Sequence, residues 1–111
     1  MRPRDSYISV LTVGELRRGV ANLPSGRKKD LLESLNRELI DSFESRVLPI
    51  NSQIAGLWGE ISGEARRRGP AVAVIDGLIG ATALAHDLIV VTRDVWDFDP
   101  TGCKLLCPWS D

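Results

Sequence analysis

The sequence predicts an α/β fold with a mostly parallel sheet. Short runs of β-branched and aromatic residues alternate along the chain with longer segments of helical periodicity, and strands separated by helices are typical of parallel sheets. The chain has 111 residues, of which 43% are hydrophobic and 26% are charged, close to the averages for globular proteins. We therefore expect a single domain over residues 1–111.

The first strand and helix are predicted near the N-terminus. Residues 7–11 indicate a strand, because they are rich in β-branched and aromatic side chains. Thr12 and Glu15 have the spacing of a capping box, which would begin a helix at this point. The Pro-Ser-Gly sequence at 24–26 would end that helix.

A second helix is expected from about Arg27 to Phe43. The apolar residues assigned to its inner side are Leu31, Leu32, Leu35, Leu39 and Phe43. Residues 47–50 then predict a short strand, and Pro49 would put this strand at the edge of a sheet because proline cannot donate a ladder hydrogen bond.

The second half of the chain begins with the clearest amphipathic pattern. Asn51 is the expected N-cap, and the basic run 66–68 with Gly69 marks the end of this helix. The apolar face consists of Ile54, Leu57, Trp58, Ile61 and Ala65. Asp76 opens a further helix, whose small residues allow close packing.

Two strands are predicted after this helix. Residues 88–92 form a continuous apolar run, which is typical of a strand buried on both faces, and residues 104–106 predict a last short strand. Cys103 and Cys107 with the single histidine, His86, are too few for a structural zinc site. Two positions four apart in an extended strand are too distant for a disulfide, so this pair could close only if the chain turned between them. A reducing cytoplasm is the simplest location that fits.

The candidate catalytic residues are all carboxylates. Glu15, Asp76 and Asp94 follow strands or begin helices, and reactive groups of open α/β sheets collect at such positions. Carboxylates that share one pocket repel each other unless a cation lies between them, and Mg²⁺ or Mn²⁺ prefers hard oxygen ligands. The pattern predicts metal-dependent phosphodiester hydrolysis by carboxylates among Glu15, Asp76, Asp94 and Asp97.

Each of these acids also has a purely structural interpretation. Glu15 would complete the capping box, and Asp76 would interact favourably with its helix dipole. Asp94 and Asp97 would be turn residues that follow a strand. Basic clusters at 17–18, 27–29 and 66–68 are usually solvated faces, although one of them could line an RNA path.

The overall charge and hydropathy exclude two classes of protein. Fourteen basic and fifteen acidic side chains give a formal net charge of −1, so a cationic protein that coats nucleic acid non-specifically is not expected. Residues 71–91 are mostly apolar, but Asp76, His86 and Asp87 would be costly in a bilayer. We therefore expect no membrane association.

Several segments resemble one family in order along the chain. Residues 9–20 (SVLTVGELRRGV) are similar to the second-strand motif of PIN-domain toxins of the VapC type. Residues 74–83 (VIDGLIGATA) resemble the helix of the third acid, and residues 90–94 (VVTRD) resemble the strand end of the fourth. Residues 107–109 (CPW) resemble the C-terminus, and the loop 26–29 is similar to that of the FitB-like branch.

The resemblance implies a PIN-like three-layer α/β/α fold and a single function. It implies an Mg²⁺- or Mn²⁺-dependent endoribonuclease that is the toxin of a type II toxin–antitoxin system. Glu15, Asp76 and Asp94 would be the second, third and fourth acids, and Asp97 is a secondary candidate because some members place an acid slightly later. The implied partners are an RNA substrate, an antitoxin with a DNA-binding domain, and a second copy in a homodimer.

One departure from the family pattern leaves an alternative open. Family members begin with a strand that ends in the first acid, whereas this chain starts just before the second strand, so the first central strand is expected to be missing from an N-terminally truncated PIN domain. The alternative is a catalytically impaired remnant that binds an antitoxin or dimerises. A phospho-acceptor receiver domain fits poorly, because it needs an acid pair directly after its first strand.

Overall fold

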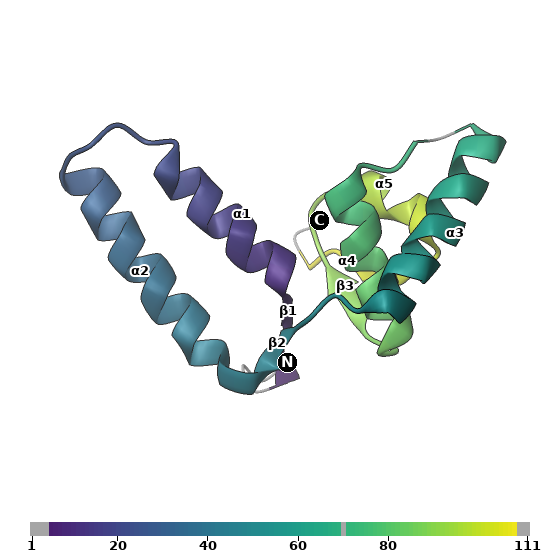
Figure 1. Cartoon of the computed structure of the whole chain (residues 1–111), viewed down its shortest axis with the longest axis horizontal. Coiled ribbons are helices and arrows are strands. Elements are labelled where there is room, and N and C mark those ends of the chain that lie inside the picture. The colour runs from purple at the N-terminus through teal and green to yellow at the C-terminus, as the bar shows by residue number, and fades with distance from the viewer. Residues whose placement is uncertain (1–4, 70, 109–111) are drawn as a thin grey trace. The chain divides into compact units, whose positions relative to one another are not determined.

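The computed structural model describes residues 5–69 and 71–108, which form a helix-rich α/β chain with short parallel strands (Figure 1). The chain consists of two compact units, Met1–Pro49 and Ile50–Asp111. The prediction of one domain over 1–111 stays a prediction, since one domain can contain two such units. The elements are β1 (Ile8–Ser9), α1 (Val10–Ala21), α2 (Arg27–Phe43), η2 (Glu44–Arg46), β2 (Val47–Leu48), α3 (Ser52–Arg68), α4 (Val74–Ala85), β3 (Ile89–Val91), α5 (Val95–Phe98), η3 (Asp99–Thr101) and β4 (Lys104–Leu106).

In the first unit, a helical hairpin connects two parallel strands. Ile8 pairs with Val47 in the β1–β2 ladder, and α1 packs against α2. The guanidinium of Arg46 joins the ends of this loop, because Nη1 donates to the carbonyl of Ser6 and Nη2 to the carbonyl of Ser42, both at 2.9 Å. The predicted helix over 27–43 and the parallel pairing are confirmed.

The start of α1 differs from the sequence-based prediction. The strand contains only Ile8 and Ser9, and the helix begins at Val10 rather than after Thr12. The hydroxyl of Ser9 accepts a hydrogen bond from the backbone N–H of Leu11 at 3.1 Å, so Ser9 is the N-cap and outweighs the β-propensity of the residues that follow. The capping box of Thr12 and Glu15 was therefore a wrong prediction, since both residues lie inside the helix.

The inner side of α2 also differs from the prediction. Leu31, Leu35 and Leu39 are 60%, 49% and 47% exposed. The side that faces α1 carries Asn36 instead, whose Nδ2 donates to the carbonyl of Leu16 at 2.9 Å. The pattern could not reveal this rotation, because α2 has apolar residues on more than one side.

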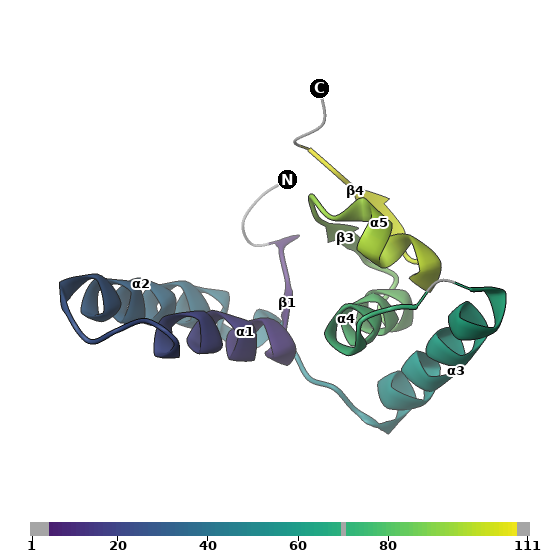
Figure 2. The same ribbon diagram turned by 90° about the horizontal axis from the view of Figure 1, so that it is seen from above.

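In the second unit, α3 and α4 pack closely, and β3 pairs with β4 in parallel (Figure 2). The predicted N-cap of α3 is confirmed, because Oδ1 of Asn51 accepts from the N–H of Ile54 at 2.9 Å. Ile54 and Ala65 are buried, as the amphipathic pattern of α3 predicted. A small core of Ala83, Phe98 and Cys103 lies between α4, α5 and the start of β4.

Strand β3 is not buried on both faces, contrary to the prediction. Val90 packs against the core, but Ile89 is 55% and Val91 is 40% exposed. Within the described part of the unit β3 has a single ladder, to β4. Only one face of the strand is therefore covered, which follows the ordinary alternation of side chains along a strand.

Two further predictions concern the cysteines and the hydropathy. Cys103 and Cys107 lie on either side of β4 and are not joined to each other by a disulfide. Among the described residues, the helices are all too short or too polar to span a bilayer. Trp109 lies outside the described residues.

Candidate active site

Asp76 lies in the first turn of α4 and is half-buried. The N-cap residue of this helix is Ala73, which has no side-chain acceptor for the first backbone N–H groups. These N–H groups carry the positive end of the helix dipole, so the carboxylate of Asp76 lies where a negative charge is favoured. The helix begins two residues before the predicted start, at Val74, so Asp76 lies in its first turn rather than opening it.

Two glycines allow other parts of the unit to approach α4 closely. A Cβ atom added to Gly77 would lie 2.8 Å from Cδ1 of Trp58 on α3, and one added to Gly80 would lie 2.8 Å from Oγ1 of Thr101 in η3. The side chain of Thr101 is held in place, because its hydroxyl donates to the carbonyl of Phe98 at 2.6 Å. These contacts fix the helix that carries Asp76 against α3 and η3.

A tight reversal brings α4 back into β3. Asp87 has a φ of 53°, and the N–H of Leu88 donates to the carbonyl of Ala83 at 2.8 Å. Because the chain turns back at this point, the start of α4 and the carboxyl end of β3 lie at the same end of the second unit. Asp76 lies in the first of these segments, and Asp94 follows the second. Helix α4 contacts α5, the helix that directly follows Asp94.

Asp94 lies in the turn that follows β3 and Asp97 lies in α5, and both are exposed. The backbone N–H of Asp94 donates to Oγ1 of Thr92 at 2.9 Å, and that of Asp97 donates to the carbonyl of Asp94 at 3.0 Å. The carboxylate of Asp94 forms no capping hydrogen bond with α5. Its backbone therefore accounts for the turn, and its carboxylate is not used to begin the helix.

Glu15 belongs to the first unit, where it is exposed in the middle of α1. Glu15 does not belong to a capping box, because the helix begins five residues before it, at Val10. The meeting of Glu15 with Asp76 and Asp94 stays a prediction, and so do the catalytic roles of all three residues.

The donor chemistry of these residues suits a hard divalent cation. Glu15, Asp76, Asp94 and Asp97 offer only carboxylate oxygens, which are the protein ligands that Mg²⁺ and Mn²⁺ prefer. Within either unit, residues 5–69 and 71–108 contain no group of three His, Cys, Asp or Glu side chains arranged to hold an ion.

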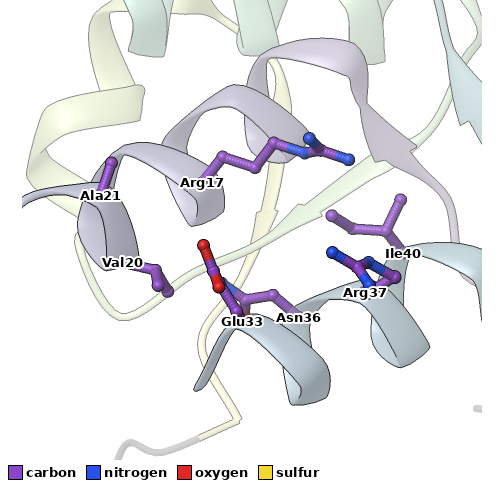
Figure 3. A pocket seen from close by; sticks show the side chains of 7 residues that line it. All are labelled: Arg17, Val20, Ala21, Glu33, Asn36, Arg37 and Ile40. Carbon is purple, nitrogen blue, oxygen red and sulfur yellow. The ribbon is translucent and has the colours of Figure 1, made fainter. Parts of the chain in front are cut away.

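The first unit contains a cleft between α1 and α2 of about 250 Å³ (Figure 3). Its lining residues are Arg17, Val20, Ala21, Glu33, Asn36, Arg37 and Ile40. None of the predicted metal ligands is among them.

Trp96 was not singled out in the sequence, although it lies between Asp94 and Asp97. It is 87% exposed on α5, while Phe98 of the same helix is buried in the core. The sequence signal that could have identified Trp96 is an aromatic residue between two acids, shortly after a predicted strand. A large indole that is left in solvent beside the candidate acids is a surface on which a planar group could stack.

Residues 2–99 match the PIN domain family. The chain belongs to this family. The matched segment contains all four candidate acids, Glu15, Asp76, Asp94 and Asp97.

Several relatives of this PIN-domain chain carry toxin or ribonuclease names. The chain is 40% identical to Toxin FitB of Neisseria gonorrhoeae over 108 residues, which are 96% of this chain and 78% of that protein. It is 34% identical to VapC ribonuclease Y4jK of Sinorhizobium fredii over 94% of this chain and 75% of that protein. These similarities confirm the resemblance to VapC-type toxins of the FitB-like branch.

Solved structures confirm the PIN fold. The structure described as FitAB bound to an IR36 DNA fragment matches with a TM-score of 0.93 and 34% identity. The match covers 99% of this chain and 78% of the chain in that structure. The crystal structure of FitAcB from Neisseria gonorrhoeae has a TM-score of 0.91 and 38% identity, with 98% and 79% covered.

Proposed function

We propose that this protein is the toxin of a toxin–antitoxin pair and cleaves RNA as a divalent-metal-dependent endonuclease. The observation that carries the proposal is the similarity to a named toxin and a named VapC ribonuclease over 94% or more of the chain. The location of Asp76 and Asp94 at one end of the second unit supports it, because a phosphodiester must approach several carboxylates at once.

In the proposed mechanism, Asp76, Asp94 and Glu15 would hold the cation, with Asp97 as a further ligand. Mg²⁺ or Mn²⁺ would supply charge neutralisation at the phosphate and a more acidic water molecule. The carboxylate of Asp76 lies in the first turn of α4, where the helix dipole favours a negative charge. The turn after β3 holds Asp94 through its backbone hydrogen bonds and leaves the carboxylate available.

The RNA chain needs further contacts, since the net charge is only −1. Arg66, Arg67 and Arg68 are exposed in the last turn of α3, and the short connection 69–73 leads from them to the start of α4 and Asp76. We propose that these arginines bind phosphates on either side of the scissile bond. Trp96 would stack on a base beside the same bond.

The proposed partner is an antitoxin with a DNA-binding domain. Solved structures similar to this chain are described as FitAB bound to DNA and as VapBC from Salmonella typhimurium bound to DNA, the latter with 28% identity and a TM-score of 0.69. We further propose that the protein works in the cytoplasm and forms a homodimer.

Removal of the metal tests the proposal. The purified chain is expected to cleave single-stranded RNA with Mg²⁺ or Mn²⁺, and EDTA is expected to abolish this activity, because the carboxylates alone cannot activate water. Cleavage would be followed on denaturing gels, and addition of excess Mn²⁺ should restore it. Cleavage that persists in EDTA would contradict the proposal. Antitoxin binding without any cleavage would favour the impaired-remnant alternative instead.

Replacement of Trp96 tests the stacking contact. Trp96→Ala is expected to raise the KM for RNA about tenfold, because stacking on one base contributes about 1–3 kcal/mol, while kcat changes little. Trp96→Phe keeps an aromatic face and should retain most of the affinity. Steady-state cleavage of a short single-stranded RNA gives both constants. A fall in kcat with an unchanged KM would argue against a stacking role.

A further inference from the structure

The cleft between α1 and α2 is lined by one side of each helix. Its residues recur three or four positions apart on both helices, so they form two rows along the hairpin (Figure 3). Nδ2 of Asn36 donates to the carbonyl of Leu16 at 2.9 Å, and Val20 is buried beside it in the lining. Contacts between the two helices therefore hold the cleft in shape.

Two guanidinium groups lie at one end of this cleft. Figure 3 shows Arg17 of α1 and Arg37 of α2 at the end that Ile40 lines. Both arginines are exposed, and neither forms a hydrogen bond or a salt bridge with a described residue. Two like charges in one cleft repel each other, and an anion bound there would stabilise both. Because a guanidinium can donate two parallel hydrogen bonds, it matches the oxygens of a phosphate.

The other end of the cleft carries a hydrogen-bond acceptor. The carboxylate of Glu33 points into the space between the helices (Figure 3). Nζ of Lys29 donates to the carbonyl of Ala21, the last residue of α1, at 3.5 Å. Among the described lining residues, two guanidinium groups thus stand against one carboxylate, and the Lys29 ammonium adds a positive charge nearby. The cleft favours an anion that also has a hydroxyl donor for Glu33.

A sugar–phosphate unit of RNA supplies both of these groups. Its phosphate oxygens would pair with the guanidinium groups, and its 2′-hydroxyl would donate to the carboxylate of Glu33. Val20 and Ile40 offer apolar contacts to the carbon atoms of the ribose. The cleft of about 250 Å³ is smaller than the about 300–1,000 Å³ of sites that enclose a whole small molecule. Its size therefore favours one unit of a longer chain over a free ligand.

An acidic peptide fits this cleft less completely. Its carboxylates could also pair with Arg17 and Arg37. A further acidic side chain beside them would lie close to Glu33, and like charges repel. Each unit of RNA, in contrast, carries a hydroxyl donor at a fixed distance from its phosphate. The observed set of one acceptor and two guanidinium groups therefore favours RNA.

We infer that the cleft between α1 and α2 binds a sugar–phosphate unit of single-stranded RNA, with the phosphate on Arg17 and Arg37 and the 2′-hydroxyl on Glu33. The inference rests on the proposed ribonuclease function and adds a substrate contact to it. None of the candidate acids lines the cleft, so this contact holds the strand and takes no part in bond cleavage. Because the formal net charge is −1, local contacts of this kind must replace attraction by overall charge.

RNA binding in the absence of cleavage tests the two arginines. The affinity of the full chain for a fluorescein-labelled oligouridylate would be measured by fluorescence anisotropy in EDTA, which removes divalent cations. Arg17→Ala and Arg37→Ala are each expected to bind about tenfold more weakly than the wild type. Because each lost phosphate contact releases fewer counterions, the slope of log affinity against log salt should fall by about 0.7 in each variant.

Arg18→Ala is the matched control for these variants. Arg18 is an exposed arginine that follows Arg17 on the same helix, and it does not line the cleft. Its replacement removes the same charge from α1, but solvent and salt screen that charge, so the affinity should fall by less than about twofold. All three arginines are exposed, so circular dichroism should show the same helix content in every variant.

The contact with the ribose is tested with a matched DNA. The wild type is expected to bind oligouridylate at least about fivefold more tightly than oligodeoxyuridylate, because only the ribose carries a 2′-hydroxyl. Glu33→Ala removes the acceptor and should abolish this preference. If Glu33 acted only through its charge, its replacement would change the affinities for RNA and DNA by the same factor.

Three results would overturn the inference. A wild type that binds no RNA, or arginine variants that bind it as well as Arg18→Ala does, would show that the cleft holds no phosphate. An RNA preference that is absent from the wild type or persists in Glu33→Ala would remove the ribose contact. Arginine variants that lose affinity for a hexaglutamate peptide but not for RNA would make the cleft a site for acidic protein segments.

The nuclease proposal is tested separately on the same samples. Addition of Mn²⁺ in place of EDTA should start cleavage of the bound RNA. A wild type that binds RNA through Arg17, Arg37 and Glu33 but does not cleave it would contradict the nuclease proposal and leave the binding site in place. A wild type that cleaves RNA, with arginine variants of unchanged affinity, would give the reverse outcome.

Discussion

Asp76→Asn is expected to lower the kcat/KM for RNA cleavage by at least about 100-fold. An amide carries no charge, so the bound cation loses one of its carboxylate ligands and part of the compensation for its own charge. A 100-fold loss corresponds to about 2.7 kcal/mol of transition-state stabilisation, which is within the range of metal-ion catalysis. Cleavage rates at saturating Mg²⁺ and an Mn²⁺ titration by calorimetry would measure the two effects.

Asp87→Asn provides the matched control for this prediction. The side chain of Asp87 is 86% exposed and pairs only at the surface with Lys104, at 3.1 Å. Exposed pairs contribute about 0–1 kcal/mol, so cleavage and stability should change little. If both asparagine variants kept wild-type activity, Asp76 would have no role in catalysis.

Gly80→Ala is expected to lower the free energy of unfolding by about 1–3 kcal/mol. The new Cβ would lie within 2.8–2.9 Å of three atoms of Thr101, including its Cβ. The side chain of Thr101 cannot rotate away at low cost, because its hydroxyl donates to the carbonyl of Phe98. Urea unfolding followed by circular dichroism would measure the loss.

Gly63→Ala should have the opposite effect. Gly63 lies inside α3, and nothing lies within 4 Å of a Cβ added there. Alanine then removes the conformational freedom of a helical glycine and should raise stability by about 0.5–1 kcal/mol. Equal effects at both positions would show that the contact between Gly80 and Thr101 does not limit the packing of α4.

Local signals in the sequence predicted most of the elements. The bounds of α2 and the N-cap of α3 follow from neighbouring residues, because helix periodicity and the Asn51 side chain act within one or two turns. The α/β class followed from the alternation of these elements. The start of α1 failed for a related reason, since two local signals competed and the hydroxyl of Ser9 prevailed over β-propensity.

Features that depend on contacts distant in sequence were not predictable in the same way. The exposure of Leu31, Leu35 and Leu39 depends on which side of α2 faces α1, and the open face of β3 depends on how many strands pair with it. The contact of Gly80 with Thr101 joins two segments that no periodicity connects. For the site, the candidate acids could be identified from their positions near strand and helix ends. The spacing of residues along the chain does not determine the distances between their carboxylates in space.

The two parallel ladders differ in the length of chain that must fold back before they can close. Ile8 pairs with Val47 across a helical hairpin, whereas Ile89 pairs with Lys104 across a much shorter segment. Closing the longer loop has the larger entropic cost, and a higher contact order slows folding. The β1–β2 ladder, in the half of the chain that is synthesised first, is therefore expected to form more slowly than the β3–β4 ladder. During synthesis, the most exposed folding intermediates should be those in which the β1–β2 ladder has not yet formed.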